Sequence, residues 1–272
     1  MPVKINKMKK ILVAVDFSSN SINALQQAVK LAAQMKAKVY VAHAYLAIKR
    51  ADTMINVNRI LKEEADEQLR ELLNNLEVPE GVQFKTKSLK GDPVTVLEKY
   101  CKKIEADLIV VGTQGERNDP EIFLGPVSGG LLKQTKIPIL VIPNNYKIEK
   151  IEKILFALKS MVINPSDKLT PLKYFIRKFN AQLQILQIKT PDTTPEDLEA
   201  SDKIKRLKAP VEFTEAENIY QGLTDYITET DFDLVCVMRR RRKFLELLFT
   251  RSLTKKDTLH SPIPMLILKG EY

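Results

Sequence analysis

The sequence has few of the residues that build disulfides, metal centres or catalytic triads. Its 272 residues include two cysteines and two histidines. Cys101 and Cys236 lie in a helical and a strand pattern, without a second thiol or histidine at ligand spacing, so we expect buried free thiols and no metal site. His43 and His260 are far apart in the chain, and no Ser-His-Asp arrangement accompanies them. We therefore expect a protein that is not an efficient enzyme.

Long apolar runs are also missing. The first seven residues lack the apolar core of a signal peptide, and no stretch reaches the roughly 18 residues of a membrane helix. We therefore expect a cytoplasmic protein with no membrane partner. The net charge of +9 is spread evenly, with 21 basic and 16 acidic side chains in residues 1–144 and 22 and 18 in residues 145–272. Since neither half is a basic domain and no zinc-finger or ribonucleoprotein pattern is present, we do not expect a nucleic-acid ligand.

One unit is present twice in the chain. Gly-Thr-Gln-Gly at 112–115 aligns with Met-Arg-Arg-Arg at 238–241, and Ile-Pro-Ile-Leu at 137–140 aligns with Ile-Pro-Met-Leu at 263–266. Both alignments need the same shift of 126 positions, which indicates a duplication. The length also suits two domains, each large enough to bury its own core. We expect the first domain over residues 1–146 and the second over residues 147–272.

Each unit alternates short apolar runs with amphipathic stretches. Continuous apolar runs are typical of strands buried on both faces. In the first unit we expect strands at 11–15, 39–44, 82–87, 108–111 and 139–142, and helices that begin at Ser18 or Ser19 and that cover 52–76 and 93–104. In the second we expect strands at 154–158, 183–188, 211–214, 234–238 and 265–268, with a shortened helix at about 196–207. This alternation predicts α/β domains with parallel, doubly wound sheets.

Sheets of this class bind ligands at the carboxyl ends of their strands, where the strand order reverses. In the first unit this places the chemistry after Val15 and Val111. Glycines at 112, 115 and 125 let backbone N–H groups approach a polyphosphate, and the helix near Gly125 points its positive dipole end there. The Asp16 carboxylate is able to accept hydrogen bonds from ribose hydroxyls or to help hold Mg²⁺. The alternative is that all four residues have structural roles only. Gly112 and Gly115 would then form a tight turn, Gly125 would start a helix, and the Asp16 carboxylate would cap one.

These residues resemble the universal stress protein family. The family's Gly-x-x-Gly, nine residues and then Gly-Ser or Gly-Thr are matched by Gly112, Gly115 and Gly125. Val-Asp-Phe-Ser at 15–18 is similar to its Val-Asp-x-Ser, and His43 to the histidine of its second strand. The resemblance covers nearly the whole chain as a tandem pair. It implies two Rossmann-like domains of the adenine nucleotide alpha hydrolase type, each with a five-stranded parallel sheet in the order 3-2-1-4-5.

The resemblance also implies a ligand, which is ATP or a related nucleotide with Mg²⁺, and no other cofactor. The implied nucleotide-binding residues are Ala14, Val15, Asp16, Ser18, His43, Ala44, Val111, Gly112, Gln114, Gly115, Gly125, Pro126, Val127 and Ser128. Pro126 stands where the family has Ser or Thr, so a hydroxyl and a backbone N–H are lost. Acidic residues at 116, 119 and 121 repel phosphate unless a cation bridges them. Weak, metal-dependent or absent binding are all open.

The second unit lacks these residues. Lys159 stands at the position of Asp16, Met238 and Arg241 replace the two loop glycines, and Arg251-Ser252 replaces Gly125-Pro126. One interpretation is a site for an anionic ligand or partner, made of Lys159, Arg239, Arg240, Arg241, Arg242 and Ser252. The alternative is a solvated basic turn that also packs between the halves.

Three functions fit these observations. The first is a stress regulator that binds a nucleotide in its first domain. The second is a nucleotide-free interaction scaffold, in which the halves pair through their last strands as an intrachain pseudo-dimer and the chain can pair again as a homodimer. The third is a slow ATPase that uses Asp16 or Glu116 as acid or base. The sequence specifies no protein partner.

Overall fold

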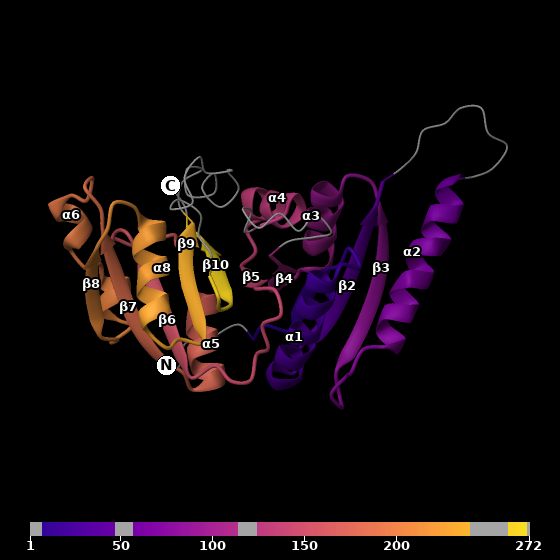
Figure 1. Cartoon of the computed structure of the whole chain (residues 1–272), viewed down its shortest axis with the longest axis horizontal. Coiled ribbons are helices and arrows are strands. Elements are labelled where there is room, and N and C mark those ends of the chain that lie inside the picture. Colours follow the sequence, from indigo (N-terminus) through magenta and orange to yellow (C-terminus); the bar gives the residue numbers. More distant parts are fainter. Residues whose placement is uncertain (1–6, 47–56, 114–123, 240–260, 271–272) are drawn as a thin grey trace.

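The computed structural model describes residues 7–46, 57–113, 124–239 and 261–270. The strands of the first repeat are β1 Lys10–Ala14, β2 Lys38–Tyr45, β3 Gln83–Lys90, β4 Leu108–Gly112 and β5 Ile139–Ile142. Those of the second are β6 Lys153–Leu158, β7 Gln182–Lys189, β8 Val211–Glu215, β9 Leu234–Arg239 and β10 Met265–Lys269. They form one sheet in the order β3-β2-β1-β4-β5-β10-β9-β6-β7-β8 (Figure 1).

The expected strand order is confirmed in both repeats, since each half reads 3-2-1-4-5 from its outer edge to the centre of the sheet. The pairing register also confirms the duplication. Ile109 lies opposite Ile139 in the first repeat, and Val235 lies opposite Met265 in the second. Each residue is 126 positions from its counterpart.

The two repeats meet at their last strands. Strands β5 and β10 are antiparallel, with Val141 opposite Met265 and Ile139 opposite Ile267. Within each repeat the paired strands are parallel. The hydrogen-bonded sheet therefore continues from one repeat into the other.

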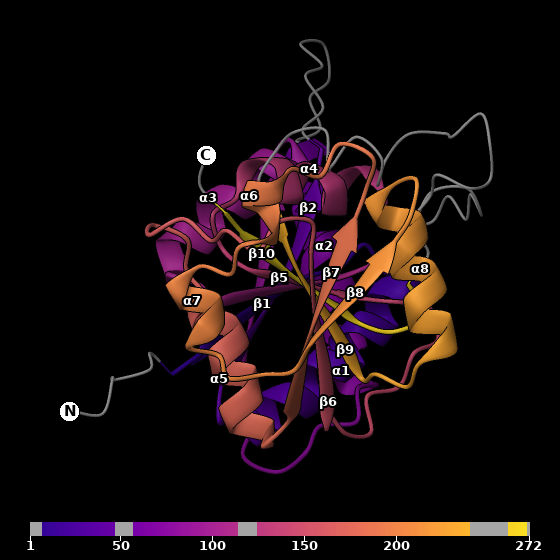
Figure 2. The same ribbon diagram turned by 90° about the vertical axis from the view of Figure 1, so that its left-hand side faces the viewer.

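Helices cover both faces of the sheet (Figure 2). They are α1 Ser19–Met35, α2 Val57–Asn74, α3 Pro93–Ile104, α4 Pro126–Gln134, α5 Thr170–Phe179, α6 Pro195–Leu198, α7 Asp202–Lys205 and α8 Ile219–Glu229. Residues of α1, α2 and α5 share one buried cluster, and residues of α3, α4 and α8 share the other. This is the doubly wound arrangement expected from the alternating pattern.

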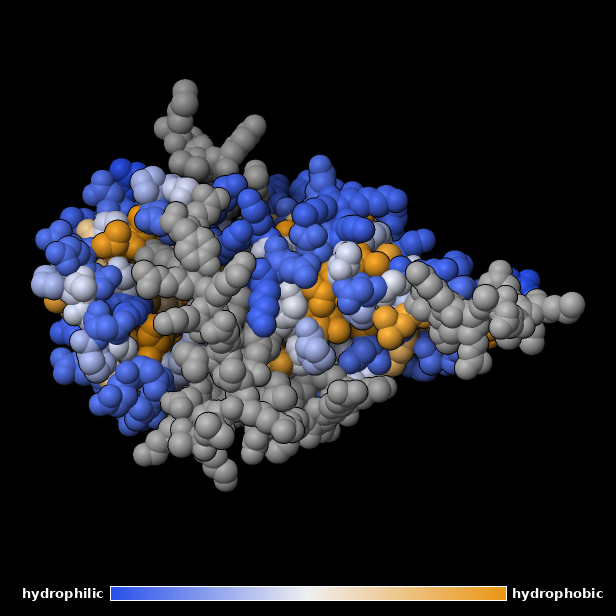
Figure 3. Space-filling model, turned by 90° about the horizontal axis from the view of Figure 1, so that it is seen from above, coloured by the Kyte–Doolittle hydropathy of each residue, from blue (hydrophilic) through white to orange (hydrophobic). Residues whose placement is uncertain are grey.

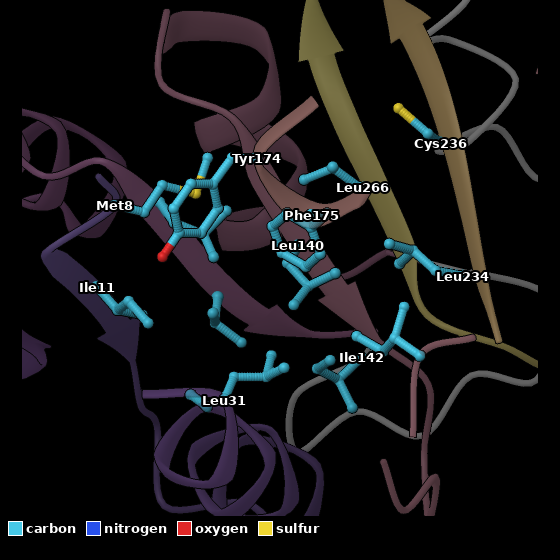
Figure 4. Packing of buried hydrophobic residues seen from close by; sticks show 14 of the residues in the cluster. Met8, Ile11, Leu31, Leu140, Ile142, Tyr174, Phe175, Leu234, Cys236 and Leu266 are labelled. Carbon is cyan, nitrogen blue, oxygen red and sulfur yellow. The ribbon is translucent and has the colours of Figure 1, made fainter. Parts of the chain in front are cut away.

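The first of these clusters crosses the junction between the repeats. Met8, which precedes β1, packs on the same side of the sheet as Tyr174 and Phe175 of α5, together with Leu140 of β5 and Leu266 of β10 (Figure 4). At about 25 cal/mol per Å² of apolar area removed from water, such burial strongly favours the joined halves. The repeats therefore share one core on this face.

Several local predictions are confirmed. Ser18 is the N-cap of α1, and α3 begins at Pro93 after the N-cap Asp92. Both cysteines are free and buried, and burial raises the pKa of the Cys101 thiol to about 12. None of the described helices is long and apolar enough to cross a membrane.

The prediction of one helix at 196–207 is wrong. The segment forms two single turns, α6 and α7, interrupted around Ser201. There the backbone N–H and the hydroxyl of Ser201 both donate to the carbonyl of Met161, while the hydroxyl oxygen accepts from the N–H of Ile163. These contacts with the loop after β6 replace helical hydrogen bonds.

Candidate functional site

Side chains of the loop between β1 and α1 form hydrogen bonds within the loop and with the first turn of α1. Asp16 is exposed, and its Oδ1 accepts hydrogen bonds from the N–H and the hydroxyl of Ser18. The Ser18 Oγ in turn accepts from the N–H of Ser21, which caps the helix. The Asp16 N–H donates to the Ser21 hydroxyl oxygen over 3.3 Å. Asp16 therefore has one carboxylate oxygen engaged in the loop.

Phe17 holds this loop in an unusual conformation. Its φ is 64°, in the left-handed region that bulky residues rarely adopt. The Phe17 ring packs against the imidazole of His43, with the ring centroids 4.4 Å apart. The His43 Nδ1 lies 2.9 Å from the carbonyl oxygen of Val15. His43 therefore joins the end of β2 to the end of β1 and to the loop that follows it.

Gly112, the last residue of β4, meets the start of α1 closely. A Cβ built on Gly112 would lie 2.9 Å from the carbonyl oxygen of Asn20, so a larger residue requires the backbone to shift. Asn20 is 3% exposed, and its Oδ1 is buried without a hydrogen-bond partner among the residues that the structure describes. An unpaired buried acceptor is costly and calls for an explanation. Asn20 approaches Gly112, the first glycine of the expected loop, with its backbone carbonyl and its Cβ.

The start of α4 faces the same strand end. Gly125 is the N-cap and donates its N–H to the carbonyl of Thr113 over 2.8 Å, which joins the two ends of the 114–124 segment. Pro126 occupies the first helical position, where its missing N–H costs the helix nothing. The N–H groups of Val127 and Ser128 precede the first helical bond, from Gly129 to Gly125, and have no partner among the described residues.

The hydroxyl of Ser128, two residues after Pro126, is engaged within the first repeat. Its hydroxyl donates to the carbonyl of Gly112 over 3.1 Å, so its proton is used within the protein. Val111 is buried, whereas Ala14 and Ala44 are half-buried at the ends of β1 and β2. Gln114 and Gly115 lie outside the described residues. Viewed from above, apolar residues gather among hydrophilic ones on the first half, on the side that carries α3 and α4 (Figure 3).

The corresponding strand end of the second repeat carries a buried methionine. Met238, the counterpart of Gly112, is buried in the same cluster as Met161 and Ile163. These two residues belong to a loop that runs from Lys159 to Leu169 before α5 begins, whereas only residues 15–18 separate β1 from α1. Because the helix begins later, Met238 does not meet a helix start as Gly112 does.

Lys159 is engaged within the repeat. It forms an ion pair with Asp192 that, with a hydrogen bond from Thr190, lowers the pKa of the Asp192 carboxyl to about 2. Gln187 is the counterpart of His43 on β7. Its Nε2 donates hydrogen bonds to the carbonyls of Lys159 and Asp197. The α6 segment therefore lies against the loop that follows β6.

The Arg239 side chain extends from β9 towards the first repeat, whereas Lys159 is paired within the second. Its guanidinium donates to the carbonyl of Thr135 at the end of α4, and only 8% of the residue is exposed. Lys159 lies instead towards the β7 side. The structure therefore does not bring these two members of the expected anion site together. Arg240, Arg241, Arg242, Ser252 and His260 lie outside the described residues.

Sequence reasoning missed Phe17, Asn20 and Thr113. Asn20 carried a usable signal, because it precedes Ala24 and Ala28 at four-residue spacing on the buried face of α1. A polar residue on that face is a candidate for a functional role. Phe17 carried none, because its left-handed φ depends on Asp16, Ser18 and His43 together.

A sequence model of the universal stress protein family matches residues 7–143. The chain belongs to this family. Universal stress protein MJ0531 of Methanocaldococcus jannaschii is 30% identical over 142 residues, which are 50% of this chain and 83% of that protein. Universal stress protein YxiE of Bacillus subtilis is 31% identical over 144 residues, 49% of this chain and 97% of its own length.

The fold of a universal stress protein extends over both repeats. The crystal structure of a universal stress protein from Archaeoglobus fulgidus superposes with a TM-score of 0.71 at 19% identity, covering 97% of this chain and 99% of that one. In the described part of this universal stress protein, no group of three or more His, Cys, Asp and Glu side chains could hold a metal ion.

Proposed function

We propose that this chain is a regulatory universal stress protein whose first repeat binds ATP or a related nucleotide weakly, without efficient catalysis. One observation carries the proposal: the starts of α1 and α4 converge on the end of β4, where the Asn20 carbonyl lies against Gly112 and the Gly125 N–H and the Ser128 hydroxyl donate to Thr113 and Gly112. At the start of α4 lie the N–H groups of Val127 and Ser128, for which the described residues provide no acceptor. N–H groups at a helix N-terminus favour phosphate, both as donors and through the helix dipole.

Mg²⁺ fits this site together with the nucleotide and not alone. Asp16 is exposed and has one carboxylate oxygen that is not used by Ser18. Mg²⁺ is commonly held by one or two carboxylates and by the phosphates of its substrate. Asp16 would hold such an ion, which would neutralise phosphate charge.

Weak binding follows from Pro126 and Ser128. Pro126 has no N–H, and the Ser128 hydroxyl donates its proton to Gly112. A hydrogen bond to a charged group contributes roughly 1.5–3 kcal/mol, so each lost donor lowers affinity about tenfold to a hundredfold. The same two residues favour the alternative function, a nucleotide-free interaction scaffold of the same family.

Calorimetric titration with ATP and Mg²⁺ tests the proposal. We expect binding near 100 μM, on the order of −5 kcal/mol, and its loss in Asp16→Asn, which keeps an acceptor for Ser18. Lys159→Ala changes the corresponding position of the second repeat and serves as the matched control, with ATP binding unchanged. Absence of heat in the wild type, together with an unmoved melting temperature, would refute nucleotide binding and favour the scaffold.

A further inference from the structure

A buried arginine of the second repeat contacts the first. Arg239 is the last residue of β9, and its Nη2 lies 3.0 Å from the carbonyl oxygen of Thr135. Its own carbonyl accepts from the N–H of Gly270 over 2.8 Å, which fixes the backbone from which the side chain extends. Charged side chains are rarely this buried unless they are paired.

The contact spans the centre of the ten-stranded sheet. Strand β10 lies between β9 and β5, and Arg239 is in register with Lys269 of β10. Two strand spacings separate β9 from β5, which is about 10 Å. Only a long side chain can cross β10 and still reach the residues that precede β5. Arginine also keeps its charge when buried and donates from a rigid, planar group.

The acceptor is the residue that ends α4. The Thr135 N–H donates to the carbonyl of Leu131 over 2.9 Å, and the Thr135 Oγ1 accepts from the N–H of Ile137 over 3.1 Å. Thr135 thus joins the last turn of α4 to the segment that enters β5. The Arg239 guanidinium adds a positive charge at the C-terminus of the helix, where the helix dipole favours it.

The opposite end of α4 carries the N–H groups of Val127 and Ser128. The helix has nine residues and is therefore about 13 Å long. A helix this short moves as a unit, so a contact that fixes its last residue also fixes the direction of its first N–H groups. We propose that Arg239 is a positioning residue for the nucleotide site of the first repeat, which it holds in place from the second repeat.

This role gives a physical reason for the arginine at this position. The counterpart of Arg239 in the first repeat is Thr113, whose carbonyl closes the base of the 114–124 segment by accepting from Gly125. In the second repeat the same position supports the neighbouring repeat instead. The expected effect on nucleotide affinity rests on the proposed function. The stabilisation of α4 by Arg239 does not depend on that function.

The test uses the full chain with three substitutions. Arg239→Gln removes the charge and the reach across β10, and Arg239→Lys keeps the charge on a side chain of similar length. Arg177→Gln removes an exposed arginine of α5 in the same repeat and is the matched control. Two quantities are measured: amide hydrogen exchange in α4 and α3 without nucleotide, and the ratio of the affinities for ATP and adenosine.

In Arg239→Gln we expect faster exchange in α4 and unchanged exchange in α3, with partial rescue in Arg239→Lys. The ATP-to-adenosine affinity ratio should fall about 2- to 30-fold, the range of such coupling effects, because only ATP uses the start of α4. Unchanged exchange in α4 overturns the inference, whether or not the wild type binds nucleotide. Faster exchange with an unchanged affinity ratio overturns it as well. A wild type that binds no nucleotide refutes the proposed function, and the exchange of α4 then decides the role of Arg239.

Discussion

The two repeats can be compared at both ends of their strands. At the amino ends, Asp107 accepts from the N–H groups of Lys9 and Lys10, and Asp233 accepts from those of Glu152 and Lys153, all over 2.7–3.0 Å. At the carboxyl ends, Gly112 has become Met238 and Asp16 has become Lys159. The end that holds the strands together is retained, whereas the end that would hold a ligand has diverged.

The position of the first helix accounts for much of this difference. In the first repeat α1 begins at Ser19 and places the Asn20 carbonyl against Gly112. In the second repeat α5 begins only at Thr170, after a longer loop whose apolar residues belong to the same buried cluster as Met238. The two repeats therefore differ in the length of the segment between their first strand and first helix, at the end of the sheet where we propose a ligand site in the first repeat.

The largest effect is expected from placing the methionine of the second repeat in the first. Gly112→Met should lower the free energy of unfolding by about 3 kcal/mol, because even its Cβ would be too close to the Asn20 carbonyl. Met238→Leu, a change of similar volume in the second repeat, should cost less than about 1.5 kcal/mol. Urea denaturation measures both. Equal costs would show that the two positions do not differ in packing.

The amino ends should respond alike. Asp107→Ala and Asp233→Ala each remove an acceptor of two backbone N–H groups, and each should cost about 2 kcal/mol. The double substitution should cost the sum within about 0.5 kcal/mol, because the sites share no partner. Denaturation of the three variants checks this. If only one of the two single substitutions lowered the free energy of unfolding, the amino ends of the two repeats would not be equivalent.

The smallest effect is expected at the ion pair that closes the second repeat. Lys159 holds the pKa of the Asp192 carboxyl at about 2, below its value in the unfolded chain. The stabilisation is therefore present above pH 4 and is lost as the pH falls towards 2. Because the Asp192 side chain is exposed and solvent screens the pair, the pair should contribute less than about 1 kcal/mol. NMR titration should show the Asp192 pKa rising towards its ordinary value in Lys159→Met, and an unchanged pKa would contradict this pairing.

The sequence predicted the strands because continuous apolar runs are a local signal that the buried sheet preserves, and the constant shift of 126 positions predicted the duplication. The strand order came from the resemblance to the family. It also predicted the α3 boundaries, since Asp92-Pro93 is a strong helix start. It did not predict the break around Ser201, where contacts with Met161 and Ile163 override a helical pattern. Such contacts join residues about 40 positions apart, and no local signal reports them.

The candidate site was predictable in part for the same reason. The place of Asp16 and Gly112 directly after predicted strands, and the match of Gly112 and Gly125 to the family's motif, indicated these three residues. The engagement of the Ser128 hydroxyl and the contact of Arg239 with Thr135 depend on how distant segments pack. The basic run after β9 looked uniform in sequence, yet its first member is buried in the interface between the repeats.

Because β5 and β10 belong to one chain, the pairing of the two repeats is intramolecular. Two separate subunits that paired through these strands would dissociate on dilution, and two different subunits would also form like pairs. Here the partners are parts of one chain, so their pairing does not depend on protein concentration. Every molecule therefore contains one repeat of each kind in fixed proportion, and the second repeat was free to change its carboxyl end without losing the first as its partner.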